Sequence, residues 1–409
     1  MNNALTHDPI RAAFEIREQL SSDKRKLGFF MGAGTSMAVG VPGIDALTSE
    51  VQDILEDPIK TQFANILTSI GEKPNVEDVL NRVRLFKELL ETSPGKEIEG
   101  LDRDTARTLD AAICKAIYKI VHVNTPGGSI PHLTIAQWLH ILHMNREFPV
   151  EIFTTNYDLI LEHAMEESGL PFFDGFVGSV NPFFVLESVE ADGATRSASV
   201  YPPKSWTRLW KLHGSIGWHL RKEGIGKKPR ITRLTDCEPQ PGEELMIFPS
   251  REKYTDSRRL PFLTYQDKLR KFCSQGEAVL FILGYSFSDE HINEIIFQGM
   301  RSNSRLAVVA LVYGDKVEAD GSGKLVLPDK LVGFGQTHRN FSIYGPDKAI
   351  IGGIVGEWQA TSKRSEVDIS SFWNEDESSF ILGDFNAFAF YLERFILFHS
   401  SEGQKAITS

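Results

Sequence analysis

The sequence predicts an α/β protein: a mainly parallel sheet with helices on both faces and an inserted helical subdomain. Short apolar segments of the length of buried strands recur, and most are followed by a helical pattern. Two of these strands run into glycine turns, at Gly32 and Gly284. Residues 45–148 show helical patterns and prolines but no strand pattern. The expected strands are Leu27–Met31, Pro149–Phe153, Trp206–Leu212, Leu245–Pro249, Ala278–Leu283, Leu306–Val312 and Phe341–Tyr344.

The composition predicts a cytoplasmic protein. Apolar residues make up 41% of 409 residues, which is enough for a large core, yet no apolar run reaches the length of a membrane span. The net charge of −11 argues against direct nucleic-acid binding as the main role. The start of the chain lacks a signal-peptide core. The three cysteines show no CxxC spacing, which fits a reducing compartment and argues against a cysteine zinc site: Cys114, Cys237 and Cys273.

The segment after the first predicted strand has the pattern of a nucleotide-binding turn. Leu27–Met31 is apolar and runs into Gly32–Ser36, reading GAGTS. Open, Rossmann-like sheets receive phosphates at such turns, because glycine lets the backbone bend and approach a ligand closely. Met37 stands where the dinucleotide fingerprint has its third glycine, so an ordinary dehydrogenase is not indicated. A tight turn without a ligand is the alternative.

Helices are expected to fill the inserted subdomain, 45–148, and the C-terminal segment, 365–409. Prolines separate the helical patterns, and their apolar positions are most simply core. Asp289, Glu290 and His291 are adjacent on another predicted helix, where their side chains diverge and do not converge on a metal. The expected helices are Ile10–Leu20, Ala46–Leu55, Ile59–Ile70, Val76–Glu91, Thr105–Val121, Leu133–His143, Leu159–Glu167, Pro261–Ser274 and Asn386–His399.

Polar residues follow the predicted strand Pro149–Phe153. The chain continues as Thr154–Asp158, reading TTNYD, and then as the helix Leu159–Glu167. Open α/β sheets build their sites at the carboxyl ends of strands, so this segment is a candidate site. The alternative is that Thr155 or Asn156 merely caps the following helix.

A histidine stands at the end of the next expected strand, Trp206–Leu212. The local sequence is KLHGSIGW, and His213 is placed where an imidazole can move protons at neutral pH. A structural histidine is the alternative, and His219 is a weaker candidate. Residues 171–205, which precede this strand, read as an aromatic-rich loop that serves as a lid, a core cover or a partner surface.

The strand Ala278–Leu283 repeats the architecture of the opening turn. It leads into Gly284–Asp289, reading GYSFSD, and then into a helix. Helix capping by Ser286 or Ser288 is the alternative to a role in a site. Residues 321–324, reading GSGK, lack the upstream glycine of a phosphate loop and are interpreted as a surface hairpin.

Together these four motifs occur in the order and strand-end context of the sirtuin (SIR2) family, which the chain resembles from about Gly28 to Tyr313. The resemblance implies a sirtuin fold and a single SIR2-like domain over residues 1–409. It implies that NAD phosphates lie against the first turn, with neighbouring hydroxyls beside them. The NAD-binding residues expected there are Gly32, Ala33, Gly34, Thr35, Ser36 and Thr155.

The same resemblance implies roles for the other strand ends. Asn156 and Asp158 would face the nicotinamide ribose, where a neutral amide can orient water and a carboxylate can stabilise a developing cation. His213 would be the catalytic base. Gly284 and Ser286 would line the adenosine side.

The chain also departs from protein-deacylating sirtuins. Their glycine turn continues into a proline-aspartate-phenylalanine-arginine run, whereas residues 41–45 read VPGID. Their four-cysteine zinc module cannot be supplied by Cys237 and Cys273. With its long helical insertion, the chain looks like SIR2-like proteins of bacterial antiviral defence that consume NAD, and most like the SIR2 subunit paired with a HerA-type ATPase.

The resemblance therefore implies an NAD⁺ hydrolase that releases nicotinamide and ADP-ribose, depletes NAD⁺ in antiphage defence, and is gated by assembly. NAD is expected as substrate, with no metal. A HerA-type ATPase partner and a homo-oligomer are expected. The alternatives are an NAD-dependent protein deacylase and a non-catalytic NAD- or ADP-ribose-sensing subunit.

Overall fold

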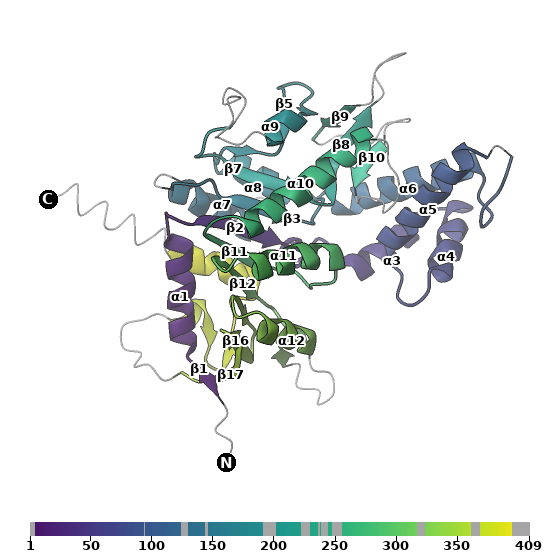
Figure 1. Cartoon of the computed structure of the whole chain (residues 1–409). Helices are drawn as coiled ribbons and strands as arrows, with labels where there is room; N and C mark the ends of the chain where they lie inside the picture. The colour runs from purple at the N-terminus through teal and green to yellow at the C-terminus, as the bar shows by residue number, and fades with distance from the viewer. Residues whose placement is uncertain are drawn as a thin grey trace.

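A ten-stranded sheet forms the centre of the chain in the computed structural model (Figure 1). Its strand order is β1-β17-β16-β15-β12-β11-β2-β3-β7-β4. The bounds are β1 Thr6–His7, β2 Lys26–Met31, β3 Glu151–Thr154, β4 Phe172–Phe173, β7 Thr207–Lys211, β11 Ala278–Leu283, β12 Leu306–Leu311, β15 Phe341–Tyr344, β16 Lys348–Ile351 and β17 Ile354–Trp358. The structure describes residues 5–93, 95–123, 130–143, 146–190, 202–221, 230–235, 238, 244–247, 256–316, 324–360 and 369–394.

The sheet is mainly parallel, as predicted. All neighbours from β15 to β4 pair in parallel, while β16 runs antiparallel to both β15 and β17. The central strands are apolar along their length because both of their faces are covered. The antiparallel edge of β16 and β17 was not predicted, because Lys348–Trp358 mixes polar and glycine residues with its apolar ones.

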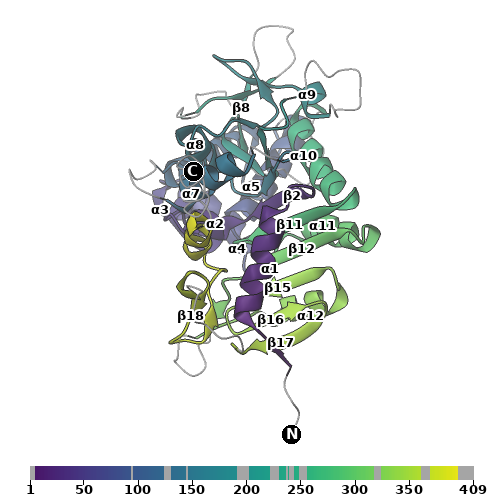
Figure 2. The same cartoon turned by 90° about the vertical axis from the view of Figure 1, so that its left-hand side faces the viewer.

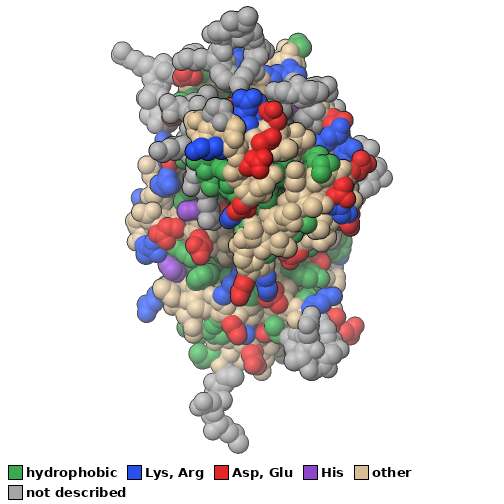
Figure 3. All heavy atoms as spheres, turned by 90° about the vertical axis from the view of Figure 1, so that its right-hand side faces the viewer, with side chains coloured by type: hydrophobic (Ala, Val, Ile, Leu, Met, Phe, Trp, Pro, Cys, Tyr) green, Lys and Arg blue, Asp and Glu red, His purple; other side chains and the backbone are tan. Residues whose placement is uncertain are grey.

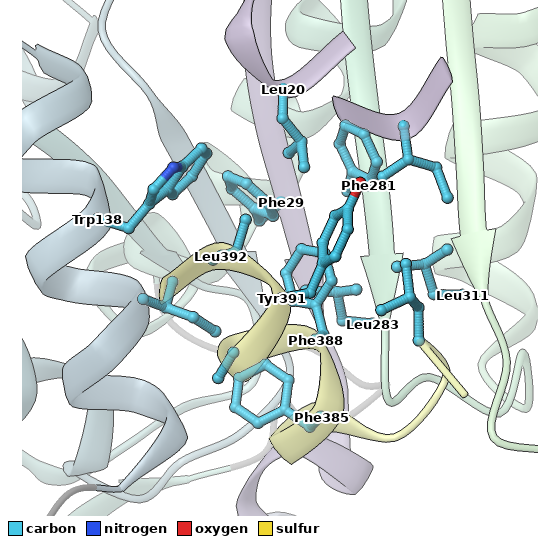
Figure 4. Close-up of a cluster of buried hydrophobic side chains, with 14 of the residues drawn as sticks. Leu20, Phe29, Trp138, Phe281, Leu283, Leu311, Phe385, Phe388, Tyr391 and Leu392 are labelled. Atoms are coloured by element: carbon cyan, nitrogen blue, oxygen red, sulfur yellow. The ribbon is translucent and has the colours of Figure 1, made fainter. Parts of the chain in front are cut away.

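Helices cover both faces of this sheet (Figures 1 and 2). Successive strand residues point to opposite faces, so Phe29 belongs to one apolar cluster and Phe30 to the other. The Phe29 face packs against α1, α7, α8 and a helix at 385–394, and Figure 4 shows this cluster. The Phe30 face packs against α10, α11 and α12. The bounds are α1 Pro9–Ser21, α7 Pro131–Leu142, α8 Ile160–Glu167, α10 Asp256–Ser274, α11 Glu290–Ser302 and α12 Asp329–Thr337.

A separate helical cluster forms between β2 and β3, at the right of Figure 1. Its core joins residues of α3–α6 to Leu159, Ile160 and Ile216, which follow the ends of β3 and β7. The last helix of the expected insertion, α7, instead packs on the sheet. The helical bounds are α2 Ala33–Met37, α3 Ile44–Ile54, α4 Ile59–Ser69, α5 Val76–Glu91 and α6 Arg103–Val121.

A second, five-stranded sheet occupies part of the region that was expected to be loop or polar excursion. Its order is β10-β8-β9-β6-β5. Strands of two residues carry no detectable periodicity, which explains why the sequence did not predict β5 and β6. The bounds are β5 Phe176–Val177, β6 Phe183–Phe184, α9 Leu186–Glu190, β8 Gly214–Arg221, β9 Arg230–Arg233 and β10 Glu244–Ile247.

The C-terminal segment begins with a small hairpin rather than a helix. Strands β18 (Trp373–Asn374) and β19 (Ser379–Phe380) follow a short 3-10 turn, Ile369–Ser371. Residues 385–394 are then helical, and the hydroxyl of Tyr391 donates to the carbonyl of Ala13 over 2.6 Å. The part of the predicted tail helix from 395 onward lies outside the described residues, as do Gly321–Gly323. Strands β13 (Asp315–Lys316) and β14 (Leu325–Val326) flank those glycines in an antiparallel pair.

The sheet topology creates one switch point. After β2 the chain builds β3 and β7 on one side, and then returns to build β11, β12 and β15 on the other side. Open α/β sheets bind ligands outside the carboxyl ends of the strands at such a reversal. In this sheet the reversal lies between β2 and β11, so the Gly32 and Gly284 turns meet there.

Candidate active site

The two glycine turns pack backbone against backbone. The N–H of Gly32 donates to the carbonyl of Leu283 over 2.9 Å, and the N–H of Gly34 donates to the carbonyl of Gly284 over 2.8 Å. A Cβ on Gly34 would lie 2.8 Å from the Cα of Gly284. A Cβ on Gly284, whose φ is +59°, would lie 2.5 Å from the N of Thr35. The glycines are therefore required by this contact, whether or not a ligand binds.

This packing reduces the number of backbone N–H groups that the first turn could offer to NAD phosphates. The N–H of Thr35 donates to the carbonyl of Gly32 over 3.0 Å, so the N–H groups of Gly32, Gly34 and Thr35 all have acceptors within the protein. Binding of NAD phosphates by Gly32–Ser36 stays a prediction. Donors other than these three N–H groups would have to make the contact.

Asn156 ties the end of β3 to the glycine turn. Its Nδ2 lies 3.0 Å from the carbonyl oxygen of Gly32, 3.0 Å from Oγ1 of Thr35 and 2.8 Å from Oγ of Ser36. Its own backbone N–H donates to Oγ1 of Thr154. Asn156 is therefore buried and fixed, and it does not cap α8, since its amide bonds to the first glycine turn and the N–H of Ile160 at the helix start donates to Asp158. The capping alternative is wrong for Asn156 and for Thr155.

Ser36 and Asp158 extend this connection. The hydroxyl of Ser36 accepts from Asn156 and donates to Oδ2 of Asp158 over 2.6 Å, while Oδ1 of Asp158 accepts the N–H of Ile160. Both Ser36 and Asp158 are buried. The turns after β2 and β3 are thus joined by a polar chain of three side chains, which runs from Asn156 through Ser36 to Asp158.

Lys211 also binds to the segment that follows β3. This buried lysine ends β7 and donates to the carbonyl oxygen of Asp158 and, over 2.8 Å, to Oε1 of Glu162. A buried cation needs such partners. In the sequence, Lys211 is visible only as the first residue of the KLHGSIGW motif. Its position two residues before the candidate base was the signal for a supporting role.

His213 reaches across the sheet to Asp289. Its Nε2 lies 3.0 Å from Oδ2 of Asp289, the residue that caps α11. Strands β7 and β11 are three strand spacings apart in the sheet, about 14 Å. The turns that carry His213 and Asp289 must therefore arch over the ends of β2 and β3, where Gly32 and Asn156 lie. His213 is 8% exposed, so the pair is a sheltered bridge above the cluster.

Asp289 is a site residue that the sequence analysis missed. Burial alone would raise the pKa of its carboxyl group, but the hydrogen bond and charge of His213 and the N–H groups of Ile292 and His291 outweigh burial and lower the pKa. Asp289 therefore remains ionised beside the imidazole, which it can orient and stabilise when protonated. Its place at the end of the GYSFSD motif was the available signal.

Ser286 and Gly284 lie on the other side of the switch point. Ser286 is exposed, and its hydroxyl donates to Oγ of Ser288 over 2.9 Å. Because Asp289 supplies the side-chain cap of α11, the capping alternative is wrong for both serines. Contact of Gly284 and Ser286 with adenosine stays a prediction.

A second residue that the sequence analysis missed comes from the inserted helices. Glu77 lies in the first turn of α5, and burial raises the pKa of its carboxyl group to about 7, against an ordinary value of 4.5. The charges of Asp78 and Asp289 raise this pKa further, and the charge of His213 lowers it. Glu77 therefore lies within electrostatic range of the His213–Asp289 bridge.

Glu77→Gln is expected to stabilise the folded protein at alkaline pH. Because the folded-state pKa of about 7 exceeds the ordinary 4.5, folding favours the protonated carboxyl, and the cost of ionising it grows as the pH rises through this window. The free energy of unfolding of Glu77→Gln, relative to the wild type, should rise by about 1 to 2 kcal/mol between pH 5.5 and 8.5. Urea unfolding at both pH values measures it, and a pH-independent difference would contradict the assignment.

A pocket of about 290 Å³ is lined by residues around β4, β5 and the start of β7, and it includes none of the candidate site residues.

Among the described residues no group of three or more His, Cys, Asp or Glu side chains could hold a metal ion, and Cys237 lies outside them. No described helix has the length and apolar character to cross a membrane. Acidic and basic side chains are interspersed on the face drawn in Figure 3.

Comparison with known proteins places a family resemblance on part of the chain. Residues 150–325 match the family model of the SIR2-like domain. This segment contains Asn156, Asp158, His213, Gly284 and Asp289. A search of curated protein sequences found no match.

Solved structures of Sir2 proteins resemble the chain at low identity. One, from a study of the mechanism and regulation of Sir2 enzymes, is 13% identical, covers 80% of this chain and 92% of its own, and has a TM-score of 0.35. A Sir2 homologue–NAD complex is 11% identical, covers 78% of this chain and 87% of its own, and has a TM-score of 0.38.

Proposed function

We propose that this chain, whose residues 150–325 match a SIR2-like domain, hydrolyses NAD⁺ to nicotinamide and ADP-ribose. The observation that carries the proposal is the His213–Asp289 bridge above the Asn156–Ser36–Asp158 chain, at the switch point of the sheet. Together the bridge and the chain supply a base (His213), a neutral amide (Asn156) and a carboxylate (Asp158) in the place where an open α/β sheet receives a nucleotide.

The reaction needs little from the protein beyond these groups. The bond between ribose C1′ and the nicotinamide nitrogen breaks, and the nitrogen keeps the electron pair. The departing ring is already cationic in NAD⁺, so it leaves neutral and requires no acid. The site must then stabilise an oxocarbenium-like sugar and deliver water to C1′, with one proton released as the new C–O bond forms.

The described side chains fit these tasks. His213 takes the proton of the attacking water, directly or through a ribose hydroxyl, and Asp289 stabilises the imidazolium that forms. The two N–H donors of the Asn156 amide are satisfied by acceptors of the first glycine turn, so the side chain is fixed, and its Oδ1 is the atom that orients water or a ribose hydroxyl. Asp158 places negative charge behind it, where it favours the developing cation.

The test is to incubate the purified chain with NAD⁺, with and without an acyl-lysine peptide, and to separate the products by chromatography. Hydrolysis predicts equal amounts of nicotinamide and ADP-ribose without any peptide. Nicotinamide release that requires the peptide would make the chain a deacylase. Binding of NAD⁺ with no release, alone or in assembly, would make it a sensor.

The same proposal includes control by assembly. An ungated NAD⁺ hydrolase would drain its own cell, so we assign the chain to a homo-oligomer that works with a HerA-type ATPase in antiphage defence, as its motifs and helical insertion suggest. Light scattering combined with activity measurements tests this. A monodisperse monomer that is fully active alone at low concentration would contradict gating by assembly.

A further inference from the structure

Two side chains hold the turn between β11 and α11, which carries Asp289. The hydroxyl of Tyr285 lies 3.0 Å from Oδ1 of Asn293 and 3.2 Å from the carbonyl oxygen of Asp289. Asn293, which is buried near the start of α11, donates from Nδ2 to the carbonyl of Phe287 over 3.0 Å. Tyr285 and Asn293 thus form a turn clamp, which ties the turn to the helix that follows it.

The backbone that the turn clamp holds is strained at Phe287. Its φ is +55°, in the left-handed region that a bulky side chain seldom adopts and keeps only where surrounding contacts enforce it. The Phe287 ring is buried among other rings, including that of Tyr285 at 4.9 Å between centroids, and its carbonyl is held by Asn293. Ser286 and Ser288, on either side, are exposed. The buried ring and the turn clamp therefore hold the chain in this conformation.

The carboxylate oxygens of Asp289 have different partners. Oδ1 accepts two backbone N–H groups at the start of α11, and Oδ2 lies 3.0 Å from Nε2 of His213. The carbonyl of Asp289 accepts the N–H of Asn293 over 3.0 Å and also faces the Tyr285 hydroxyl. The helix cap therefore fixes one side of Asp289, and the turn clamp fixes the backbone from which its side chain reaches His213.

Tyr285 also packs against the first glycine turn and its strand. Its ring lies 4.7 Å from the ring of Phe30 on β2, measured between centroids. A Cβ on Gly32 would lie 2.7 Å from the Cα of Tyr285, so the two backbones are in close contact. The carbonyl of Gly32 is the same group that Asn156 contacts. The turn clamp therefore holds Asp289 relative to the turn against which Asn156 is fixed.

We propose that Tyr285 and Asn293 are positioning residues of the active site, which act on His213 through Asp289. The inference rests on the proposed hydrolysis, in which His213 takes the proton of the water that bonds to C1′ and the nicotinamide nitrogen keeps the electron pair of the broken bond. Without the turn clamp, Phe287 leaves its left-handed conformation and Oδ2 of Asp289 withdraws from the imidazole. A displacement of about 1 Å in a catalytic site can cost up to about a hundredfold in rate.

The first test needs no NAD and follows the proton on Nε2 of His213 by ¹H–¹⁵N NMR of histidine-labelled protein. The ionised carboxylate of Asp289 can only accept, so Nε2 carries this proton, and the sheltered hydrogen bond should give it a separate downfield signal. His213→Ala identifies the signal by its loss, and Asp289→Asn shows how it changes without the carboxylate. Tyr285→Phe and Asn293→Ala should change it in the same direction as Asp289→Asn.

Matched controls delete the same chemical groups elsewhere in the chain. Tyr391→Phe removes a hydroxyl that donates to a backbone carbonyl, and Asn340→Ala removes an amide that donates to two backbone carbonyls. None of these bonds involves the turn after β11, so both controls should leave the His213 signal as in the wild type. A wild-type signal in Tyr285→Phe and in Asn293→Ala would overturn the proposal.

The second test measures NAD⁺ turnover in a double-mutant cycle. Tyr285→Phe should lower turnover about tenfold in the wild-type background but less than twofold when Asp289→Asn is already present, because the hydroxyl acts through that carboxylate. Tyr391→Phe should match the wild type. Equal losses from Tyr285→Phe in both backgrounds would overturn the positioning role. A wild-type chain without turnover would instead reject the hydrolase, and the NMR comparison would still decide whether the turn clamp holds Asp289 against His213.

Discussion

His213→Ala is expected to lower NAD⁺ turnover by about a hundredfold or more with the fold intact. Imidazole is the side chain that most often serves as a base at neutral pH, and the imidazole of His213 is held by an ionised carboxylate, Asp289. Its removal leaves the attacking water without a base. Nicotinamide release by the variant, with folding checked by circular dichroism, measures the effect.

Asn156→Ala is the companion variant and should cost turnover to a similar degree. It also deletes three contacts to the first glycine turn, so a lower thermal midpoint is expected from Asn156→Ala than from His213→Ala.

Near-normal turnover in a well-folded His213→Ala protein would contradict the assignment of His213 as the base and leave it a structural role.

Gly34→Val is expected to destabilise the fold itself, by about 3 kcal/mol. If this turn holds NAD phosphates, as the sequence predicts, the valine would also fill phosphate space and block binding. The structure shows that its Cβ would first collide with the backbone of Gly284, which lies 2.8 Å away and cannot rotate aside as a side chain would. The free energy of unfolding, measured in urea, gives the size of the effect.

Gly333→Ala is the matched control for that measurement. Gly333 lies within α12, and a Cβ there meets no atom within 4 Å. The alanine should leave stability unchanged or raise it by up to about 1 kcal/mol. Unaltered stability of Gly34→Val would show that the two turns separate easily, contrary to the packing described.

The sequence predicted the parts of this site that follow strand-end rules. Gly32, Asn156, His213 and Gly284 each stand just beyond a short apolar run, and parallel strands bring such positions to one edge of the sheet. Their mutual contacts, such as Asn156 with Ser36, depend on strand order, which the local pattern does not contain.

The roles of Glu77 and Asp289 were not predicted, for a physical reason. Glu77 and Asp289 act on His213 from segments far away in sequence, and a glutamate in the first turn of a helix looks locally like ordinary dipole compensation. In the same way, α7 reads as one more helix of the insertion, and only its packing on the Phe29 face separates it from α3–α6.

Binding and chemistry can be separated with carba-NAD, an analogue in which a methylene replaces the ribose ring oxygen, so that no oxocarbenium forms. Calorimetry of carba-NAD with the wild type and with His213→Ala, alongside NAD⁺ turnover of the same samples, tests the central claim most directly. The account predicts that both proteins bind the analogue within about threefold of each other, while turnover differs by about a hundredfold or more. Loss of binding in step with turnover, or a wild-type chain that does not bind, would contradict it.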